Sequence, residues 1–350
     1  MVSLSISLRI EANVEAFNAV ETVGNLTKHR RAPMVIPSDA GYKLVYVPAV
    51  SGESIANAYQ RNLVDATKVI YKTSPPLTQW DLRYEFSKFM DKNHLTPNLM
   101  KIAQSKPKDQ NTLTAAKHEF EKTAIRESIV ADIAGFLYAE EDLPVKRTSR
   151  FYVGYMLPTY DSIEAMAIEA QFHARHMPAE SGLGGERAAQ MIYYVEVASA
   201  LYGLTVLLDI DGIGRTSLVK IEDAVDSNER INRIKVALAA LQGLFLGIGF
   251  GAKLSRFMPV KRVVSGVAVV TNPISTTAAP AQIPSFVEDT ESKMAKLASS
   301  LSKLGINMNY EIIAYGGKPR ETKTKRASTA EEFFEYITDS VLRLLGSQKS

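Results

Sequence analysis

Val2-Ser-Leu-Ser-Ile-Ser-Leu-Arg-Ile10, at the start of the chain, alternates apolar with polar residues at every step. Because successive side chains of a strand point to opposite faces, this period of two predicts a half-buried β-strand. The stretch has no basic segment followed by an apolar run, so it does not have the pattern of a signal peptide. We expect the fold to start from a strand whose Val, Leu and Ile side chains face a core.

The elements that follow favour an α+β fold. We expect strands at 42–47, 150–157, 169–176, 189–197, 201–210, 263–270 and 307–315. We expect helices at 51–70, 114–141, 228–245 and 286–304, and a last helix that Ser328-x-x-Glu331 opens as a capping box and Gly346 ends. The order strand, helix, strand, strand, helix, strand fits a split βαβ, ferredoxin-like core. An open doubly wound sheet is the alternative, although it predicts a more regular alternation.

Two long segments do not belong to this regular pattern. Residues 11–40 are polar and show no sustained period. Residues 71–112 contain Pro75-Pro76 and the only tryptophan, Trp80, and they are long for a loop in a compact domain. The second segment therefore predicts an inserted lobe with short helices.

Composition excludes several classes of protein. At about 150 residues per domain, 350 residues indicate two domains or one domain with large insertions. The chain has no cysteine, which excludes a disulfide framework, a thiolate nucleophile and a Cys-ligated metal, and which fits a cytoplasmic protein. The longest apolar stretch, 236–252, is shorter than the roughly 20 residues of a membrane span.

Basic residues are clustered, although the net charge of +3 is too small to indicate nucleic-acid binding by itself. Clusters lie at 28–31, 146–150, 253–262 and 318–326, while acids gather elsewhere, for example at 222–229 and 331–335. Such a distribution predicts a positive face that attracts phosphates and binds in a salt-dependent manner. Taken singly, each cluster is also compatible with ordinary solvated loop charges.

Motifs that carry chemistry are few. Gly247-x-Gly249-x-Gly251 follows a helix and precedes a strand, the reverse of a dinucleotide fingerprint, so it indicates either close backbone approach to a phosphate or neighbouring chain, or a simple helix stop. His29 and His173 could serve as acid and base on RNA, or could be polar residues of an exposed hairpin.

Tyr193 and Tyr194 are adjacent on an expected strand, so they point to opposite faces. One of them could stack on a base while the other packs in the core, and packing roles for both are the alternative. The sequence leaves this assignment open.

Several stretches, taken in order, carry a family resemblance. They are 8–30, which ends in Val-Gly-Asn-Leu-Thr-Lys-His-Arg; Val47-Pro-Ala-Val-Ser-Gly-Glu-Ser-Ile-Ala-Asn-Ala-Tyr59; Arg147-Thr-Ser-Arg150; Gln190-Met-Ile-Tyr-Tyr-Val-Glu-Val197; Leu201-Tyr-Gly-Leu-Thr-Val-Leu-Leu-Asp209; and Phe257-Met-Pro-Val260. Together they resemble the archaeal CRISPR-associated backbone subunit of type I-A Cascade, in the DevR group of the RAMP superfamily.

The resemblance implies a hand-shaped protein. A ferredoxin-like (RRM-like) palm would comprise 1–70 and 143–350, a helical finger-like insertion 71–142, and a protruding thumb β-hairpin 169–190. Copies would assemble along a CRISPR RNA with other Cascade subunits, and the bases would stay free to pair with target DNA. The subunit would have no catalytic activity, no cofactor, no metal and no membrane contact.

The resemblance also implies a set of RNA-binding residues, which supply phosphate and 2′-OH contacts with little base readout. They lie in the first loop, at the start and on the exposed face of helix 51–70, beside the palm, on the thumb and in the glycine loop. The set is Asn18, Asn25, Lys28, His29, Arg30, Arg31, Ser51, Gly52, Asn57, Gln60, Arg61, Arg147, Arg150, His173, Arg175, His176, Gly249, Gly251 and Lys253.

One departure from related proteins bears on catalysis. RNA-cutting cousins in type III complexes carry an Asp before a Ser-Pro-hydrophobic sequence, and here the matching stretch is Arg31-Ala32-Pro33-Met34-Val35. We therefore expect no cleavage of target RNA. A RAMP-type ribonuclease that uses His29 or His173 on single-stranded RNA is the alternative function, and a small-molecule enzyme that uses the glycine loop is a third.

Overall fold

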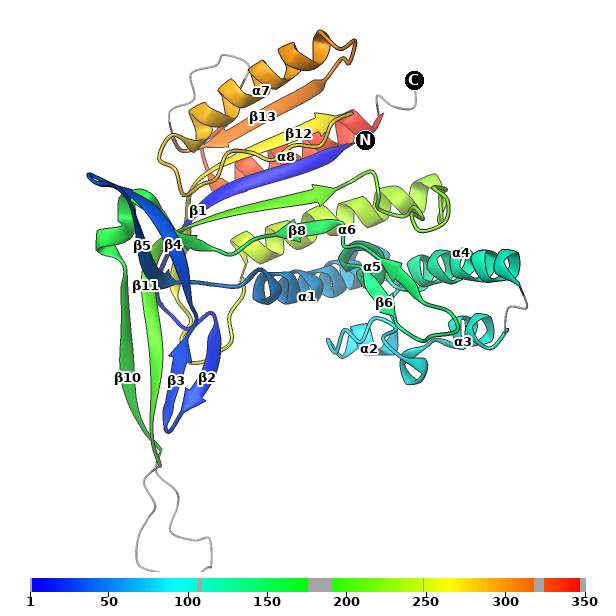
Figure 1. Ribbon diagram of the computed structural model, residues 1–350, viewed down its shortest axis with the longest axis horizontal. Helices are drawn as coiled ribbons and strands as arrows, with labels where there is room; N and C mark the ends of the chain where they lie inside the picture. The colour runs from blue at the N-terminus through cyan, green and yellow to red at the C-terminus, as the bar shows by residue number, and fades with distance from the viewer. Residues whose placement is uncertain (1, 106–108, 176–190, 248, 318–323, 347–350) are drawn as a thin grey trace, which may run out of the picture.

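A ten-stranded mixed sheet forms the centre of the molecule (Figure 1). The computed structural model describes residues 2–105, 109–175, 191–247, 249–317 and 324–346. The strands of the sheet are β1 (Ser3–Glu15), β2 (Ala19–Val23), β3 (Leu26–His29), β8 (Phe151–Val153), β9 (Leu157–Pro158), β10 (Ala167–Arg175), β11 (Met191–Asp209), β12 (Val260–Asn272), β13 (Asn309–Tyr315) and β14 (Lys325–Ala327). Their main order is β14-β13-β12-β1-β11-β3-β2, and β8, β9 and β10 also pair with β11.

Helices cover both faces of this sheet. On one face α1 (Gly52–Tyr71), α6 (Ser227–Leu246) and α8 (Ala330–Gly346) pack on the large apolar cluster that contains Leu4, Ile6 and Leu8. On the other face α7 (Phe286–Ser302) packs on Val267 and Val269 of β12. The strands and helices expected at 42–47, 51–70, 228–245, 263–270, 286–304 and 307–315 are confirmed to within a few residues.

β1 is buried on both faces, so the expectation of a half-buried strand was wrong. Ser5 accepts a hydrogen bond from the backbone N–H of Ala278, and Ser3 and Ser7 bond to threonines on the neighbouring strands. Arg9 donates to the backbone oxygen of Ala281 and to Asp161. The segment before α7 therefore covers the polar face, and each of these four side chains has at least one hydrogen-bond partner there, although Arg9 Nη2 has none.

A lobe with an apolar cluster of its own lies beside α1. It contains α2 (Gln79–Leu82), a 3₁₀ turn (Lys92–His94), α3 (Pro97–Ala103), α4 (Gln110–Glu127), α5 (Ile129–Ala134) and the hairpin β6 (Phe136–Tyr138) with β7 (Val145–Arg147). The helix expected over 114–141 was wrong beyond Ala134. Gly135, at φ +72°, ends it, and a Cβ there would lie 2.4 Å from the backbone oxygen of Arg147.

An arm of four strands, β10, the first half of β11, β3 and β2, projects from the sheet (Figure 1). The two strands expected at 189–197 and 201–210 are one continuous strand, β11. The polar segment 11–40, to which no element was assigned, forms the end of β1, then β2, β3 and β4 (Arg31–Ser38). Strand β4 pairs with β5 (Gly41–Pro48) as a separate hairpin.

Two local expectations also need correction. The strand expected at 150–157 is broken into β8 and β9. Thr329, and not Ser328, caps α8, because the Glu332 backbone N–H donates to Thr329 Oγ1, and the Glu332 carboxylate accepts from the Ser328 N–H, so the expected Ser328–Glu331 capping box was wrong. Within the described residues, we find no helix of the length and apolarity that a bilayer crossing needs.

Candidate nucleic-acid interface

Asn18 connects two of the segments that the sequence singled out. Its side-chain oxygen accepts one hydrogen bond from Arg30 Nε at 2.9 Å and another from the backbone N–H of Ser51 at 2.8 Å. The first basic cluster is thereby fixed against the N-terminus of α1. Ser51 itself is buried and caps the helix through Ser54, so the expectation that its N–H is open to a phosphate was wrong.

The first basic cluster lines a cavity of about 360 Å³ at the base of the arm. Lys28, Arg30 and Arg31 border it together with Glu21 and Glu196. Lys28 pairs with Glu21 at 3.2 Å, and Arg31 pairs with Glu196 at 3.1 Å. The Lys28 and Arg31 side chains are exposed to solvent, so both ion pairs are weak and a phosphate can compete for either cation. Asn25, in the β2–β3 turn, donates to the Ile192 backbone oxygen at 3.4 Å.

A second cavity, of about 540 Å³, separates α1 from the glycine loop. Asn57 and Arg61 of α1 face Gly249 and Gly251 across it, so residues almost two hundred positions apart are brought together. Gly249 and Gly251 have φ angles of +84° and +147°, which strongly favour glycine. A Cβ at Gly251 would lie 2.9 Å from the Phe17 ring.

Lys261, absent from the expected set, supports the glycine loop. Its ammonium donates to the backbone oxygens of Phe245 and Gly247 at 3.3 and 3.2 Å, at the C-terminus of α6. Burial lowers the pKa of Lys261 to about 8. Lys253 is partly buried next to the loop, and burial and the adjacent Arg256 lower its pKa. Lys261 belongs to a long basic cluster, and the sequence gives no signal that distinguishes a lysine that binds backbone oxygens from one that faces solvent.

His29 is buried, so its expected contact with RNA was wrong. Its Nε2 lies 2.9 Å from Glu15 Oε1, and its Nδ1 lies 2.8 Å from the Arg30 backbone oxygen. Tyr202 donates to the same Glu15 oxygen at 2.7 Å. Burial alone would lower the pKa of His29, but the hydrogen bond and charge of Glu15 outweigh it and raise that pKa. Because each ring nitrogen faces a hydrogen-bond acceptor, only the protonated imidazolium can donate to both.

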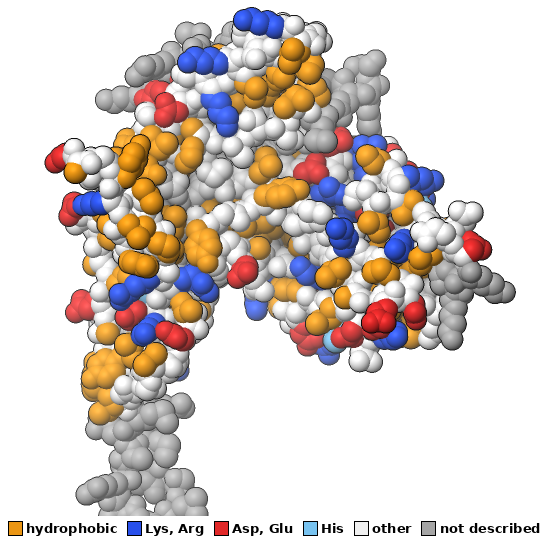
Figure 2. Space-filling view, in the orientation of Figure 1, with side chains coloured by type: hydrophobic (Ala, Val, Ile, Leu, Met, Phe, Trp, Pro, Cys, Tyr) orange, Lys and Arg blue, Asp and Glu red, His pale blue; other side chains and the backbone are white. Residues whose placement is uncertain are grey.

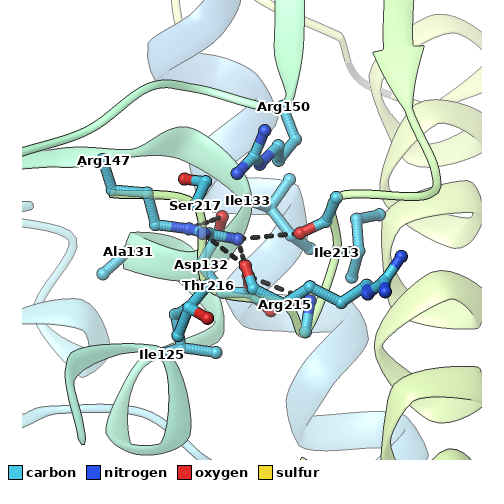
Figure 3. Close-up of polar contacts among 12 residues, drawn as sticks. Ile125, Ala131, Asp132, Ile133, Arg147, Arg150, Ile213, Arg215, Thr216 and Ser217 are labelled. Atoms are coloured by element: carbon cyan, nitrogen blue, oxygen red, sulfur yellow. Dashed lines mark hydrogen bonds and ion pairs between the residues drawn. The ribbon is translucent and has the colours of Figure 1, made fainter. Parts of the chain in front are cut away.

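Arg147 is also buried, and its assignment to the interface was wrong (Figure 3). All five of its N–H donors are used: they bond to the side chains of Asp132 and Glu121 and to the backbone oxygens of Asp132, Gly212 and Arg215. Arg233 of α6 binds the other Asp132 oxygen at 3.0 Å. This network joins the lobe to α6 and leaves Arg147 no donor for a phosphate.

Two further members of the expected set face inward. Arg150 pairs with Asp209 at 3.0 Å and is mostly covered. Gln60, which was expected on the exposed face of α1, is buried, and its side chain donates to the Ala56 backbone oxygen. Gly52 is half-buried where α1 approaches β8, and a Cβ there would lie 2.6 Å from the Val153 oxygen.

The thumb residues are described only in part. His173 lies on the β10 face that meets the loop after Gly251, where it stacks on Tyr193 at 5.2 Å between ring centroids. Arg175 ends β10, and His176 lies outside the described residues, as does the hairpin tip at 177–190. Among the residues that the structure describes, no group of three or more His, Asp and Glu residues could hold a metal ion.

Comparison with known proteins agrees with the resemblance. Residues 6–291 match the family model described as CRISPR-associated negative auto-regulator DevR/Csa2. The chain is 40% identical over 275 residues to the CRISPR-associated aCascade subunit Cas7/Csa2 2 of Saccharolobus solfataricus, covering 77% of this chain and 79% of that protein. It is 28% identical over 322 residues to the CRISPR-associated protein Cas7/Cst2/DevR of Methanocaldococcus jannaschii, covering 89% and 92%.

Among solved structures, a chain of a "CRISPR RNA-guided surveillance complex, pre-nicking" aligns with this protein at a TM-score of 0.48 and 9% identity. The alignment covers 97% of this chain and all of that one. This likeness is too distant to carry an argument. The sequence matches alone are sufficient to show the family. The chain belongs to the CRISPR-associated DevR/Csa2 family.

Proposed function

We propose that this protein is a non-catalytic backbone subunit of a CRISPR RNA-guided surveillance complex, and that it binds the phosphates of a CRISPR RNA. Family membership supports the assignment to this class of complex, since a relative of 40% identity is named an aCascade subunit. Copies of the chain would lie side by side on the RNA in the cytoplasm, with other Cascade subunits. The bases would stay available to pair with target DNA.

The observation that carries the proposal is the pair of hydrogen bonds on the Asn18 oxygen. They place Arg30 at the N-terminus of α1, and the exposed face of α1 continues to Asn57, Arg61 and the glycine loop. Cations, exposed polar side chains of α1 and glycine backbone thus follow one another along one route. Such groups bind a nucleic-acid backbone without reading its sequence.

The strand order supports a ferredoxin-like palm. The elements β1, α1, β8, β11, α6 and β12 follow in the order β-α-β-β-α-β, and their four strands lie in the order β12-β1-β11-β8, all antiparallel. In the same proposal the lobe between α1 and β8 is the finger-like insertion and the β10–β11 hairpin is the thumb.

The lack of catalysis is part of the proposal. His29, a candidate acid–base residue of the alternative ribonuclease, is buried and held by Glu15, and Arg31 occupies the position matched to the catalytic Asp of the RNA-cutting cousins. His173 is in ring contact with Tyr193 and Phe257. These surroundings favour structural roles for both histidines.

The test measures the mass of the purified protein by light scattering, alone and with single-stranded RNAs of increasing length. We expect the mass to rise in regular steps with RNA length, and the RNA to remain intact. Arg61→Gln should weaken the assembly, whereas Arg343→Gln, a matched change at an exposed ion pair on α8, should not. A constant mass at every length, or steady cleavage of the RNA, would refute the proposal.

A further inference from the structure

The two adjacent tyrosines of β11 have different surroundings. Tyr193 is half-buried: its ring stacks on His173, its hydroxyl accepts from Arg256 Nη1 at 3.1 Å, and the edge of Phe257 meets the His173 ring at 5.3 Å. The loop after Gly251 therefore covers this face of the arm. Tyr193 is a packing residue, and it couples the arm to the glycine loop.

Tyr194 lies on the opposite face, in a row that crosses all four strands of the arm. It is directly opposite Phe172 on β10, with ring centroids 5.6 Å apart in an edge-to-face arrangement. It is also paired with Leu26 on β3, which is paired in turn with Val23 on β2. Phe172 and Val23 are 56% and 51% exposed, so the row is open at both ends. Figure 2 shows hydrophobic side chains on the viewer's side of this arm, with Lys and Arg beside them.

Cations border the row on its own face. Glu196 lies two residues along β11 from Tyr194, which is about 7 Å for an extended backbone. It forms an ion pair with Arg31, and both residues line the basic cavity together with Lys28. Glu196 has both oxygens occupied, one by Arg31 and one by the His29 backbone N–H. The Glu196 carboxylate is thus engaged, and the cavity as a whole has three cations, Lys28, Arg30 and Arg31, against the carboxylates of Glu21 and Glu196.

An aromatic row beside a cationic cavity fits one kind of occupant. Single-stranded nucleic acid offers flat bases to the rings and phosphates to the cations at the same time, and single-strand binding proteins combine these two features. A purely apolar docking segment would use the row but not the cavity. The charge of the adjacent cavity therefore selects nucleic acid over an apolar protein segment.

We propose that Phe172 and Tyr194 form a base-stacking platform for the single-stranded RNA that the basic cluster holds by its phosphates. This inference rests on the proposed function and adds a contact to the bases, which the phosphate contacts do not supply. It also assigns the open alternative at 193–194: Tyr194 stacks and Tyr193 packs. Stacking is tolerant of sequence because every base has a flat face, so it does not require base readout.

The test compares ordinary single-stranded RNA with an abasic RNA of the same length, which keeps the phosphates and sugars. The wild-type protein should bind the abasic RNA about 5- to 150-fold more weakly, the range expected for loss of stacking on one base. The double variant Phe172→Leu, Tyr194→Leu keeps apolar bulk and should bind both RNAs with nearly equal affinity. Tyr42→Leu is the matched control, because Tyr42 is 77% exposed on the separate β4–β5 hairpin.

The outcomes separate this inference from the proposed function. Equal binding of both RNAs by the wild type would overturn the platform while leaving phosphate binding intact. No binding of either RNA would refute the proposed function itself. If the double variant keeps its preference for ordinary RNA but forms smaller assemblies by light scattering, the row contacts a second copy of the chain, and the platform is overturned. Unchanged thermal unfolding of the double variant would show that it is folded.

Discussion

Two groups of arginines have opposite environments in this molecule. Arg147 and Arg233 lie in the interior, where Asp132, Glu121 and backbone oxygens occupy their donors. Figure 3 shows Arg147 beside Asp132. Arg30, Arg31 and Arg61 lie at the surface, with at most a few polar partners each. The first group holds the lobe on the sheet, whereas the second leaves donors for a ligand.

The difference between the groups comes from acids that are distant in sequence. Asp132 and Glu121 are 15 and 26 positions from Arg147, and Arg233 reaches Asp132 across 101 positions. A cluster of basic residues in a sequence therefore does not reveal whether it faces solvent. What decides is whether the fold brings a buried carboxylate to it.

The largest effect is expected from removing the charge that the interior group shares. Asp132→Asn leaves Arg147 and Arg233 without their common carboxylate, and the loss of one partner from a buried ion network costs about 3–5 kcal/mol. Chemical denaturation should show this loss in the free energy of unfolding. Glu311→Gln, which breaks the exposed pair with Arg343, should cost about 0–1 kcal/mol. Similar costs for both variants would remove the distinction between the two groups.

How much the sequence could predict follows from the same distinction. Alternation in 2–10, the Ser51 cap and the stripe of α6 all predict their elements correctly, because each depends on a local period or a local hydrogen bond. Burial of Ser3, Ser5 and Ser7 could not be predicted, because the segment that covers them is more than 260 positions away.

Site prediction shows the same limit. Arg30, Arg31, Asn57, Arg61 and the glycine loop do line cavities, as their clustering or helical face indicates. The side chains of His29, Gln60 and Arg147 are buried instead, and Glu15 and Asp132 bind two of them, His29 and Arg147. The sequence offered Tyr194 only as one of two stacking alternatives, and it gave no sign of its pairing with Phe172 or of the support by Lys261, because only the paired strands and the end of α6 bring these partners together.

A smaller effect is expected at the boundary between the two environments, in the glycine loop. Gly251→Ala forces a side chain into φ +147° and against the Phe17 ring, and strain of this kind costs about 1–3 kcal/mol. We expect lower stability and weaker RNA binding together, since the loop both packs on Phe17 and lines the cavity with Arg61. Gly305→Ala is the control, because its φ of +76° is also positive but no atom lies within 4 Å of the added Cβ. If Gly305→Ala weakens RNA binding as much, the loop has no particular role.

The surface group should control the salt dependence of RNA binding rather than stability. Replacing Lys28, Arg30 and Arg31 together with Gln should reduce the slope of log affinity against log salt by about 0.7 for each phosphate that these cations neutralise. Titration of labelled single-stranded RNA at a series of salt concentrations measures this slope. Arg343→Gln should leave it unchanged. A slope that is insensitive to the triple change would place the phosphate-binding residues elsewhere on the molecule.

The smallest effect concerns His29, which lies inside the protein although both of its sequence neighbours line the basic cavity. Its pKa is raised in the folded protein by Glu15, above the value of about 6.5 for an unperturbed histidine. A raised folded-state pKa means that the protonated ring stabilises the fold fully below about pH 6.5, and that this contribution is lost as the pH rises through the folded-state value. We expect the unfolding free energy of the wild type to fall over that window, and His29→Gln to show a smaller fall.

Lys28→Gln, which leaves the His29–Glu15 pair in place, should keep the wild-type profile. Identical profiles for the wild type and His29→Gln would mean that the ring is neutral in the fold, and that the Glu15 contact is an ordinary hydrogen bond and not an interior ion pair like that of Arg147 with Asp132.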